Sequence, residues 1–339
     1  MPLQGDLLRT AEVWSLDDLL SRCIVLRVDV SRSVTSRTAL IGECMIELRH
    51  LSADRLALGY AGDAFNTAAY LARSAPTMDV QFVSVTGDDP YSGMMRTHWA
   101  AYGVGDTYSR VQPGGHAGLY MIRTDDNGER TFQHYRSDSA ARTLFGPGQP
   151  GSIDDAIAGH DLVYLSGITL SILTEAARER LVAVLAETRR RGGLVAYDGN
   201  YRPSGWPSPS SMAEAAARVL PHTDIALPSL EDDRLVHGDR SARDCVERLR
   251  AAGVGEIVVK LGPEGCVIAD QTSSEPVPAV PNARVVDTTS AGDAFNGAYL
   301  AARLTGAAPR SAAEAGTRLA AEVIGHPGAL LPPLNRALL

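Results

Sequence analysis

The feature that most restricts the fold is a regular alternation of short apolar segments and amphipathic segments in the second half of the chain. Strands are predicted at 161–167, 194–198, 224–227 and 256–260. Helices are predicted between them at 174–191, from about 211, and after a capping pair, Ser241 and Asp244. Connections of this length favour a mostly parallel α/β sheet, doubly wound with helices on both faces. Ligands bind such sheets at the carboxyl ends of strands, so the candidate sites are 198–202, 229–233, 260–265 and 287–293.

A second, smaller sheet is predicted in the first half of the chain. The segments 118–123 and 130–136 have strand character and flank Asp125-Asp-Asn-Gly128, a typical hairpin turn. A hairpin inside an α/β pattern indicates a sheet that is separate from the main one. Earlier in the chain, 39–48 is predicted to be one buried strand, and a helix with Phe65 and Ala68 on its apolar face follows Gly62.

The overall charge and the cysteines argue against several kinds of protein. A net charge of -8 and a pI near 5.5 argue against nucleic-acid binding and against binding to anionic membranes. The four cysteines form no C-x-x-C pair and show no metal-ligand spacing with histidine, so we expect reduced thiols and a cytoplasmic location. No apolar run approaches the ~18 residues that a membrane span needs.

Residues 1–38 precede the first predicted strand and are assigned no function. They contain an apolar patch at 23–26, but acidic residues precede it and no small-residue cleavage site follows. This pattern argues against a secretory signal. We therefore expect an N-terminal extension, 1–38, followed by one domain, 39–339.

The segment 287–299 is predicted to be a strand end, a turn of small residues and then a helix that starts near Gly292. Ala291 and Gly292 leave room for an anion to approach the N–H groups at the helix start, where the helix dipole is positive. Asp293 lies in the same turn, where its carboxylate either favours the helix start or acts as a base towards a hydroxyl. An anion cradle beside a base is what phosphoryl transfer to an alcohol requires.

The common nucleotide-binding motifs are absent or misleading. No Walker A sequence occurs in the chain. The segment 146–151 matches G-x-G-x-x-G, but it contains two prolines and follows no strand, so we interpret it as a loop. Any ATP site must therefore be built differently.

The run Asp287-Thr-Thr-Ser-Ala-Gly-Asp293 resembles the C-terminal signature of the ribokinase-like (PfkB) carbohydrate kinases, and the likeness covers roughly residues 39–330. Within that family the chain is most similar to the kinases of 2-dehydro-3-deoxygluconate, on the segments 41–48, 164–168 and 200–203. The resemblance implies a ribokinase-like fold with a β lid formed by segments around 45–60 and 115–137. It also implies ATP and Mg²⁺ as cofactors, phosphorylation of the sugar acid at its 6-hydroxyl, and a homo-oligomer formed through the lid.

The resemblance places sugar-binding residues first at the turn before the helix of the N-terminal half. Gly62, Asp63 and Asn66 match the family motif that binds sugar hydroxyls. From the residues alone, Asp63 can instead be an N-cap. Ala61 replaces the first glycine of the motif, so the loop must differ here if that position needs a positive φ.

By resemblance, Tyr120 and Arg136 in the lid also contact the sugar acid, and Arg202 binds its carboxylate. A guanidinium fork suits a carboxylate better than a neutral sugar. Without the resemblance, Arg136 would be interpreted as a surface arginine, and Arg202 could pair with a nearby Asp or Glu.

The resemblance assigns the nucleotide and the metal to the later strand ends. Ser229 and Asp232 replace the family's Asn and Glu, which organise magnesium and phosphate, and Asp232 is expected to act through water because Mg²⁺ keeps several waters. From the residues alone this segment is a solvated acidic turn, and a plain hairpin explains the glycines at 262 and 265. A helix predicted at 311–324, with a capping box from Ser311, would line the adenine pocket. The nucleotide-binding residues are Ser229, Lys260, Gly262, Gly265, Ser290, Ala291, Gly292 and Ala320.

Other functions remain open at this point. The nearest keeps the chemistry and changes the sugar, as in fructokinase or a kinase of another sugar or sugar acid, and Arg136 and Arg202 argue against a neutral sugar. The replacements at Ser229 and Asp232 allow a sugar-binding regulatory protein that has lost turnover. A nucleoside kinase shares the motifs but leaves both arginines unexplained.

Overall fold

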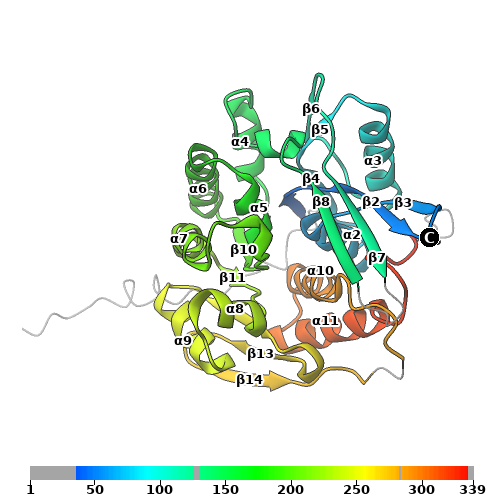
Figure 1. Cartoon of the computed structure of the whole chain (residues 1–339). Coiled ribbons are helices and arrows are strands. Elements are labelled where there is room, and N and C mark those ends of the chain that lie inside the picture. Colours follow the sequence, from blue (N-terminus) through cyan, green and yellow to red (C-terminus); the bar gives the residue numbers. More distant parts are fainter. Residues whose placement is uncertain (1–35, 125–129, 282–283, 335–339) are drawn as a thin grey trace, which may run out of the picture. The chain divides into compact units, whose positions relative to one another are not determined.

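The structure is a computed structural model that describes residues 36–124, 130–281 and 284–334 (Figure 1). Its main element is an eight-stranded sheet in the order β14-β13-β12-β11-β10-β9-β1-β4. The strands from β4 to β12 run parallel: β4 (Asp79–Val83), β1 (Arg37–Ile41), β9 (Leu162–Ser166), β10 (Leu194–Asp198), β11 (Ile225–Ala226) and β12 (Glu256–Lys260). β13 (Cys266–Ala269) and β14 (Ser274–Val277) extend one edge in antiparallel pairing. The predicted mostly parallel sheet is confirmed.

Helices cover both faces of this sheet. One face packs against α4 (Gly151–Ala158), α5 (Gly167–Ile172), α6 (Glu175–Arg190), α7 (Pro209–Val219), α8 (Leu230–His237) and α9 (Ala242–Ala251). The other packs against α2 (Asp63–Ser74), α3 (Pro90–Ala101), α10 (Ala291–Leu304) and α11 (Pro309–Val323). Leu40 and Ile41, neighbours on β1, belong to the two different cores, because successive side chains of a strand point to opposite faces.

A separate four-stranded sheet, which we call the small sheet, has the order β3-β2-β7-β8. Its strands are β2 (Met45–His50), β3 (Leu56–Ala61), β7 (Leu119–Thr124) and β8 (Arg130–Tyr135). β7 and β8 pair in antiparallel register as predicted, whereas the turn predicted at Asp125–Gly128 lies outside the described residues. A short parallel pair, β5 (Val85–Gly87) and β6 (Arg110–Gln112), completes the strands.

The prediction of one strand over 39–48 is wrong. β1 ends at Ile41 in the main sheet, and β2 begins at Met45 in the small sheet. The chain turns at Gly42, where a Cβ would lie 2.6 Å from the Cβ of Ala64 on α2. Only glycine permits this close approach, so the chain leaves one sheet and enters the other within a few residues.

The capping box predicted from Ser311 is also wrong. α11 begins at Pro309, and Ala308 is its N-cap residue without a side-chain cap. Proline has a backbone angle that suits the first turn of a helix, so the helix starts before Ser311 is reached. The box predicted from Ser241 and Asp244 is present at the start of α9.

Most of the predicted extension 1–38 lies outside the described residues, and its boundary with the domain stays a prediction. The described residues fall within one compact unit, 34–339. Among them, no helix combines the length and the apolar character needed to cross a membrane.

Candidate active site

The ends of β10 and β12 meet the first turns of α10. Nζ of Lys260, at the end of β12, lies 2.8 Å from Oδ2 of Asp198, at the end of β10, and donates to Oδ1 of Asn296 at 3.1 Å. Asn296 Nδ2 donates to the same Asp198 oxygen at 2.6 Å. A Cβ on Gly292 would lie 3.6 Å from Lys260 Nζ, so the ammonium group is held beside the start of α10.

The start of α10 presents backbone donors. The helix begins at Ala291, whose N–H donates to the Thr288 carbonyl at 3.3 Å. Among the described residues, no acceptor is found for the N–H groups of Gly292 and Asp293. These two groups, the positive end of the helix dipole and the nearby ammonium together favour an anion.

Asp293 lies in the first turn of the same helix, and its Oδ2 accepts two hydrogen bonds. The donors are Asn66 Nδ2 and Ser290 Oγ, each at 2.9 Å. Burial and, after it, the Asp63 carboxylate raise the pKa of Asp293 to about 7, and the two hydrogen bonds oppose this rise. A carboxyl group with a pKa near neutrality is suited to general base catalysis.

Helix α2 packs against α10 (Figure 1). Asp63 and Asn66 lie in the first turn of α2. Asp63 Oδ2 accepts a hydrogen bond from Asn200 Nδ2 at 2.8 Å. The alternative that Asp63 is an N-cap is wrong, because Gly62 holds that position and no side chain caps the helix. A Cβ on Gly62 would lie 2.1 Å from the carbonyl oxygen of Glu43, so the turn requires glycine.

Ala61, which replaces the first glycine of the family motif, needs no unusual backbone. It is the last residue of β3 and is buried. Among the described residues, the non-glycine residues with positive φ are Phe145, Asn200 and Ser290. The loop therefore accepts alanine without strain.

Tyr120 and Arg136, the predicted lid contacts, pair with acidic residues near the first strands. Tyr120 Oη donates to Oε2 of Glu47, and its ring stacks on His134 with ring centroids 5.8 Å apart. Arg136 forms an ion pair with Glu43, whose side chain is 1% exposed. Arg136 is therefore held by a buried carboxylate, and its side chain is 21% exposed.

Arg202, Ser229 and Asp232 lie together where α8 begins. Ser229 is the N-cap of α8, and its Oγ accepts from the N–H of Asp232 at 3.2 Å. Asp232 Oδ2 accepts from the N–H of Tyr201 at 3.2 Å and lies 3.7 Å from Arg202 Nη1. Burial raises the pKa of Asp232, and Arg202 opposes the rise. The residues predicted for the sugar carboxylate and for the metal are thus neighbours.

Three other residues predicted to bind the nucleotide, Gly262, Gly265 and Ala320, are explained by the fold alone. Gly262 and Gly265, with φ of 60° and 99°, form the turn between β12 and β13. These angles favour glycine, which is what the plain hairpin interpretation expected. Ala320 is half-buried on α11, and it packs against the core shared with α10. Their contact with a nucleotide stays a prediction.

Residues 35–336 match the pfkB family of carbohydrate kinases. The chain belongs to this family. The 2-dehydro-3-deoxygluconokinase of Dickeya dadantii is 40% identical over 303 residues, which cover 88% of this chain and 97% of the relative. The enzyme of the same name from Escherichia coli K12 is 38% identical over 304 residues, which cover 88% and 98%.

Solved structures of pfkB and related kinases share the fold. A 2-dehydro-3-deoxygluconokinase from Thermotoga maritima has a TM-score of 0.75 and 20% identity, with 88% of this chain and 95% of that chain covered. A putative ribokinase II from E. coli, in complex with ATP and Mg²⁺, has a TM-score of 0.75 and 21% identity, with 88% and 96% covered. The predicted ribokinase-like architecture is confirmed.

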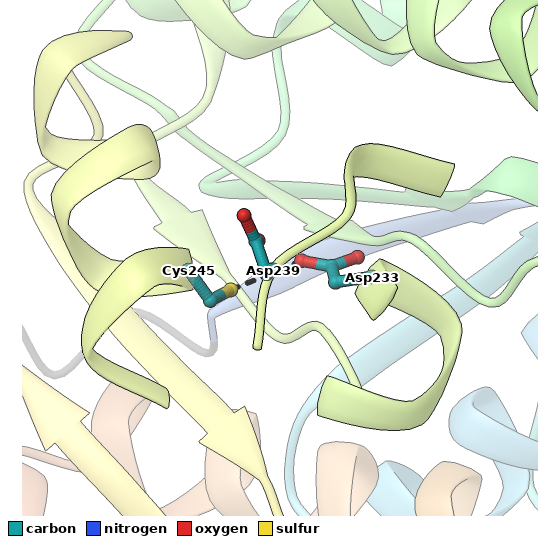
Figure 2. A group of neighbouring side chains, drawn as sticks. All are labelled: Asp233, Asp239 and Cys245. Atoms are coloured by element: carbon teal, nitrogen blue, oxygen red, sulfur yellow. Dashed lines mark hydrogen bonds between the residues drawn. The ribbon is translucent and has the colours of Figure 1, made fainter. Parts of the chain in front are cut away.

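Among the described residues of this pfkB chain, one group of side chains has metal-ligand character, namely Asp233, Asp239 and Cys245 (Figure 2). Arg248 already forms ion pairs with both carboxylates, at 2.9 Å in the case of Asp239. Cys245 Sγ donates to Asp233 Oδ2 at 3.0 Å. Because a guanidinium neutralises the carboxylates, we interpret the group as a buried ion-pair network that ties α8 to α9.

Sequence reasoning missed two residues that support the site of this pfkB chain. Asn296 bridges Asp198 and Lys260, and its signal was a polar residue on an otherwise apolar helix face, three positions after Asp293. Glu43, in the segment between β1 and β2, forms the ion pair with Arg136. No local pattern pairs Glu43 with Arg136, because these residues lie far apart in the sequence and in different elements.

Proposed function

We propose that this chain transfers the γ-phosphoryl group of ATP to the 6-hydroxyl of 2-dehydro-3-deoxy-D-gluconate. The observation that carries the proposal is the position of Asp293, in the first turn of α10 beside N–H groups that have no acceptor among the described residues. Relatives that are 38–40% identical over almost their whole length carry the name 2-dehydro-3-deoxygluconokinase. Family membership supports the reaction class, and these relatives support the substrate.

Asp293 is the base in this proposal. Its carboxylate takes the proton of the sugar hydroxyl while that oxygen attacks the γ-phosphorus, and the bond from phosphorus to the β–γ bridging oxygen breaks to release ADP. The N–H groups of Gly292 and Asp293, with Ala291 beside them, stabilise the charge on the transferring phosphoryl oxygens. Lys260 adds a positive charge at the same place, and Asp198 and Asn296 hold its ammonium group.

Asp232 is the residue proposed to hold Mg²⁺, through water. Its Oδ2 accepts from the Tyr201 N–H, and no described residue donates to its Oδ1. This arrangement fits an ion that keeps several waters and takes one or two carboxylates from the protein. When bound, Mg²⁺ offsets negative charge on the β- and γ-phosphate oxygens. The adenine is assigned to the region of Gly262, Gly265 and Ala320.

The sugar acid is assigned to the space between α2, the small sheet and Arg202. Asp63, Asn66 and the turn at Gly62 would bind its hydroxyls, and Tyr120 and Arg136 would cover it. Arg202 is proposed to bind the carboxylate, since its side chain is 57% exposed and its pairing with Asp232 is loose, at 3.7 Å. Fructokinase is the second candidate, supported by a Klebsiella pneumoniae relative of that name at 28% identity over 263 residues.

We also propose that the chain forms a homo-oligomer through the small sheet and functions in the cytoplasm. Leu56, Leu58 and Tyr135 are 42%, 44% and 58% exposed, and the strand register puts them on one face of that sheet. Apolar side chains gathered on one exposed face support a contact with a second copy. The described cysteines are unpaired and buried, as expected in a reducing compartment.

The test is an ADP-release assay with Mg-ATP and equal concentrations of 2-dehydro-3-deoxygluconate, gluconate, fructose and ribose. We expect a strong preference for the 2-keto acid. Asp293→Asn should lower kcat by about 10²–10⁴, the usual contribution of general base catalysis. Preference for fructose would support the second candidate, and absence of turnover on every sugar would support a regulatory protein. Full turnover by Asp293→Asn would exclude Asp293 as the base.

A further inference from the structure

Ser290 has a backbone conformation that its residue type disfavours. Its φ of 65° lies in the left-handed region, where a side chain crowds the backbone and glycine does not. As the N-cap of α10 it would be expected to bond a backbone N–H of the first turn, but its side chain makes no such cap. A strained residue that does not perform the usual role of its position is a reason to look for a function.

The hydroxyl of Ser290 donates instead to Oδ2 of Asp293, at 2.9 Å. Asn66 Nδ2, on α2, donates to the same oxygen at 2.9 Å. Among the described residues, none donates to Oδ1. Two donors on one oxygen fix the rotation of the carboxylate and make the other oxygen the better proton acceptor.

Building on the proposed function, we infer that Ser290 is a positioning residue for the base: with Asn66 it holds Oδ2 of Asp293, so that Oδ1 takes the proton of the sugar hydroxyl. The proton then moves from the hydroxyl oxygen to Oδ1, while the electron pair of the O–H bond goes to the oxygen that attacks the γ-phosphorus. The positive φ of Ser290 permits its hydrogen bond to Asp293, because this backbone conformation directs the side chain towards Asp293 rather than towards the N–H groups of the helix start.

The hydrogen bond from Ser290 also opposes the rise in the pKa of Asp293, and this gives a measurable signature. Other groups act on the same carboxylate and stay unchanged when Ser290 is replaced. They are Asp63 on α2, Asp198 at the end of β10, Tyr164 on β9, Tyr70 on α2 and Tyr120 on β7, with Lys260 beside Gly292.

The experiment compares Ser290→Ala and Ser290→Gly with the wild-type chain across pH. Activity needs the charged carboxylate, so kcat/KM falls as the pH drops through the pKa of Asp293, near 7. This fall is the acidic limb of the pH profile of kcat/KM. Loss of a hydrogen bond to a charged group should move the midpoint of the limb to a pH about one unit higher in both variants. Within each variant, the ratio of the rate at pH 6 to the rate on its own alkaline plateau should then be about tenfold lower than in the wild type.

The two variants separate the hydroxyl from the backbone. Glycine accepts a positive φ, so Ser290→Gly should melt at a higher temperature than Ser290→Ala, although both move the limb equally. A purely structural role would change the melting temperature and leave the limb in place. An acidic limb that coincides with the wild type in both variants, or moves in only one of them, overturns the inference.

A second readout does not depend on turnover. The chain is labelled with ¹³C at the aspartate carboxyl carbons, and the Asp293 signal is identified by its loss in Asp293→Asn. The midpoint of its titration should rise by about one pH unit in Ser290→Ala and Ser290→Gly. If the wild type does not phosphorylate the sugar acid, the proposed function fails, and this titration alone decides whether Ser290 holds the carboxylate.

Discussion

Arg136 and Arg202, the two arginines expected to contact a sugar acid, lie in different surroundings. Arg136 pairs with the buried Glu43, so its charge already has a partner in the interior. Arg202 is largely exposed and only loosely paired with Asp232. A substrate carboxylate can therefore approach Arg202 at little cost, whereas Arg136 has to share its guanidinium with Glu43.

Arg202→Gln is expected to raise the KM for the sugar acid about tenfold and to leave kcat nearly unchanged. A hydrogen bond to a charged group contributes ~1.5–3 kcal/mol, and the exposure of Arg202 argues for the lower end. Steady-state kinetics with varied sugar acid at saturating ATP measures both constants.

Arg136→Gln is the comparison. It should lower the melting temperature as well as the affinity, because it leaves the Glu43 carboxylate buried without its partner. An unchanged KM in Arg202→Gln would contradict the assignment of the carboxylate to Arg202.

At the scale of elements, helix α8 positions the end of the site to which we assign the metal, and the ion-pair network of Asp233, Asp239, Cys245 and Arg248 holds this helix. Ser229 and Asp232 begin this helix, and Asp233 follows directly. Asp233 is tied to α9 by Arg248 and Cys245, and burial raises the pKa of its carboxyl group to about 6. The network thus connects the stability of the α8–α9 pair to the geometry of the site.

Arg248→Met is expected to lower the free energy of unfolding by about 3–5 kcal/mol, the usual cost of removing one partner from a buried ion pair. The reason is that Asp233 and Asp239, both buried, lose the cation that neutralises them. Urea unfolding followed by circular dichroism measures the change.

Arg243→Met on the same helix is the matched control. Arg243 is 85% exposed and pairs with Glu247 one turn away, so its loss should hardly change the unfolding curve. Equal effects of the two substitutions would show that the network does not stabilise the protein.

At the scale of the whole molecule, the two sheets have different surroundings. The main sheet has helices on both faces, whereas the small sheet exposes Leu56, Leu58 and Tyr135 on one face. An exposed apolar face of this kind often marks a contact with a partner, and a second copy of the chain is the partner that we propose.

Leu58→Asp is expected to convert a dimer into a monomer, because it places a charge on the apolar face. Light scattering after size exclusion, over a range of protein concentrations, measures the mass. Leu235→Asp is the control: Leu235 is 59% exposed on α8, so the charge should leave the mass unchanged. A wild-type chain that is monomeric at all concentrations would contradict the proposal.

Patterns within a few residues predicted much of the fold. The alternation after 161 predicted β9, β10, β11 and β12 and the helices between them, since helix and strand periods are local properties of a sequence. The same holds for the start of α10 and for the hairpin glycines at 262 and 265. Local patterns failed at Gly42, because the contact that bends the chain there comes from Ala64 on another element.

By itself the sequence therefore determined the succession of strands and helices from β9 to β12, and the turn that carries Ala291, Gly292 and Asp293. Only the tertiary structure decided which side chains surround that turn. Asn66 reaches Asp293 across 227 positions, and Asn296 reaches Asp198 across 98. Sheet order and helix packing bring these groups together. Both depend on contacts between distant parts of the chain, whereas the patterns of residue type and spacing that predict helices and strands extend over only a few turns.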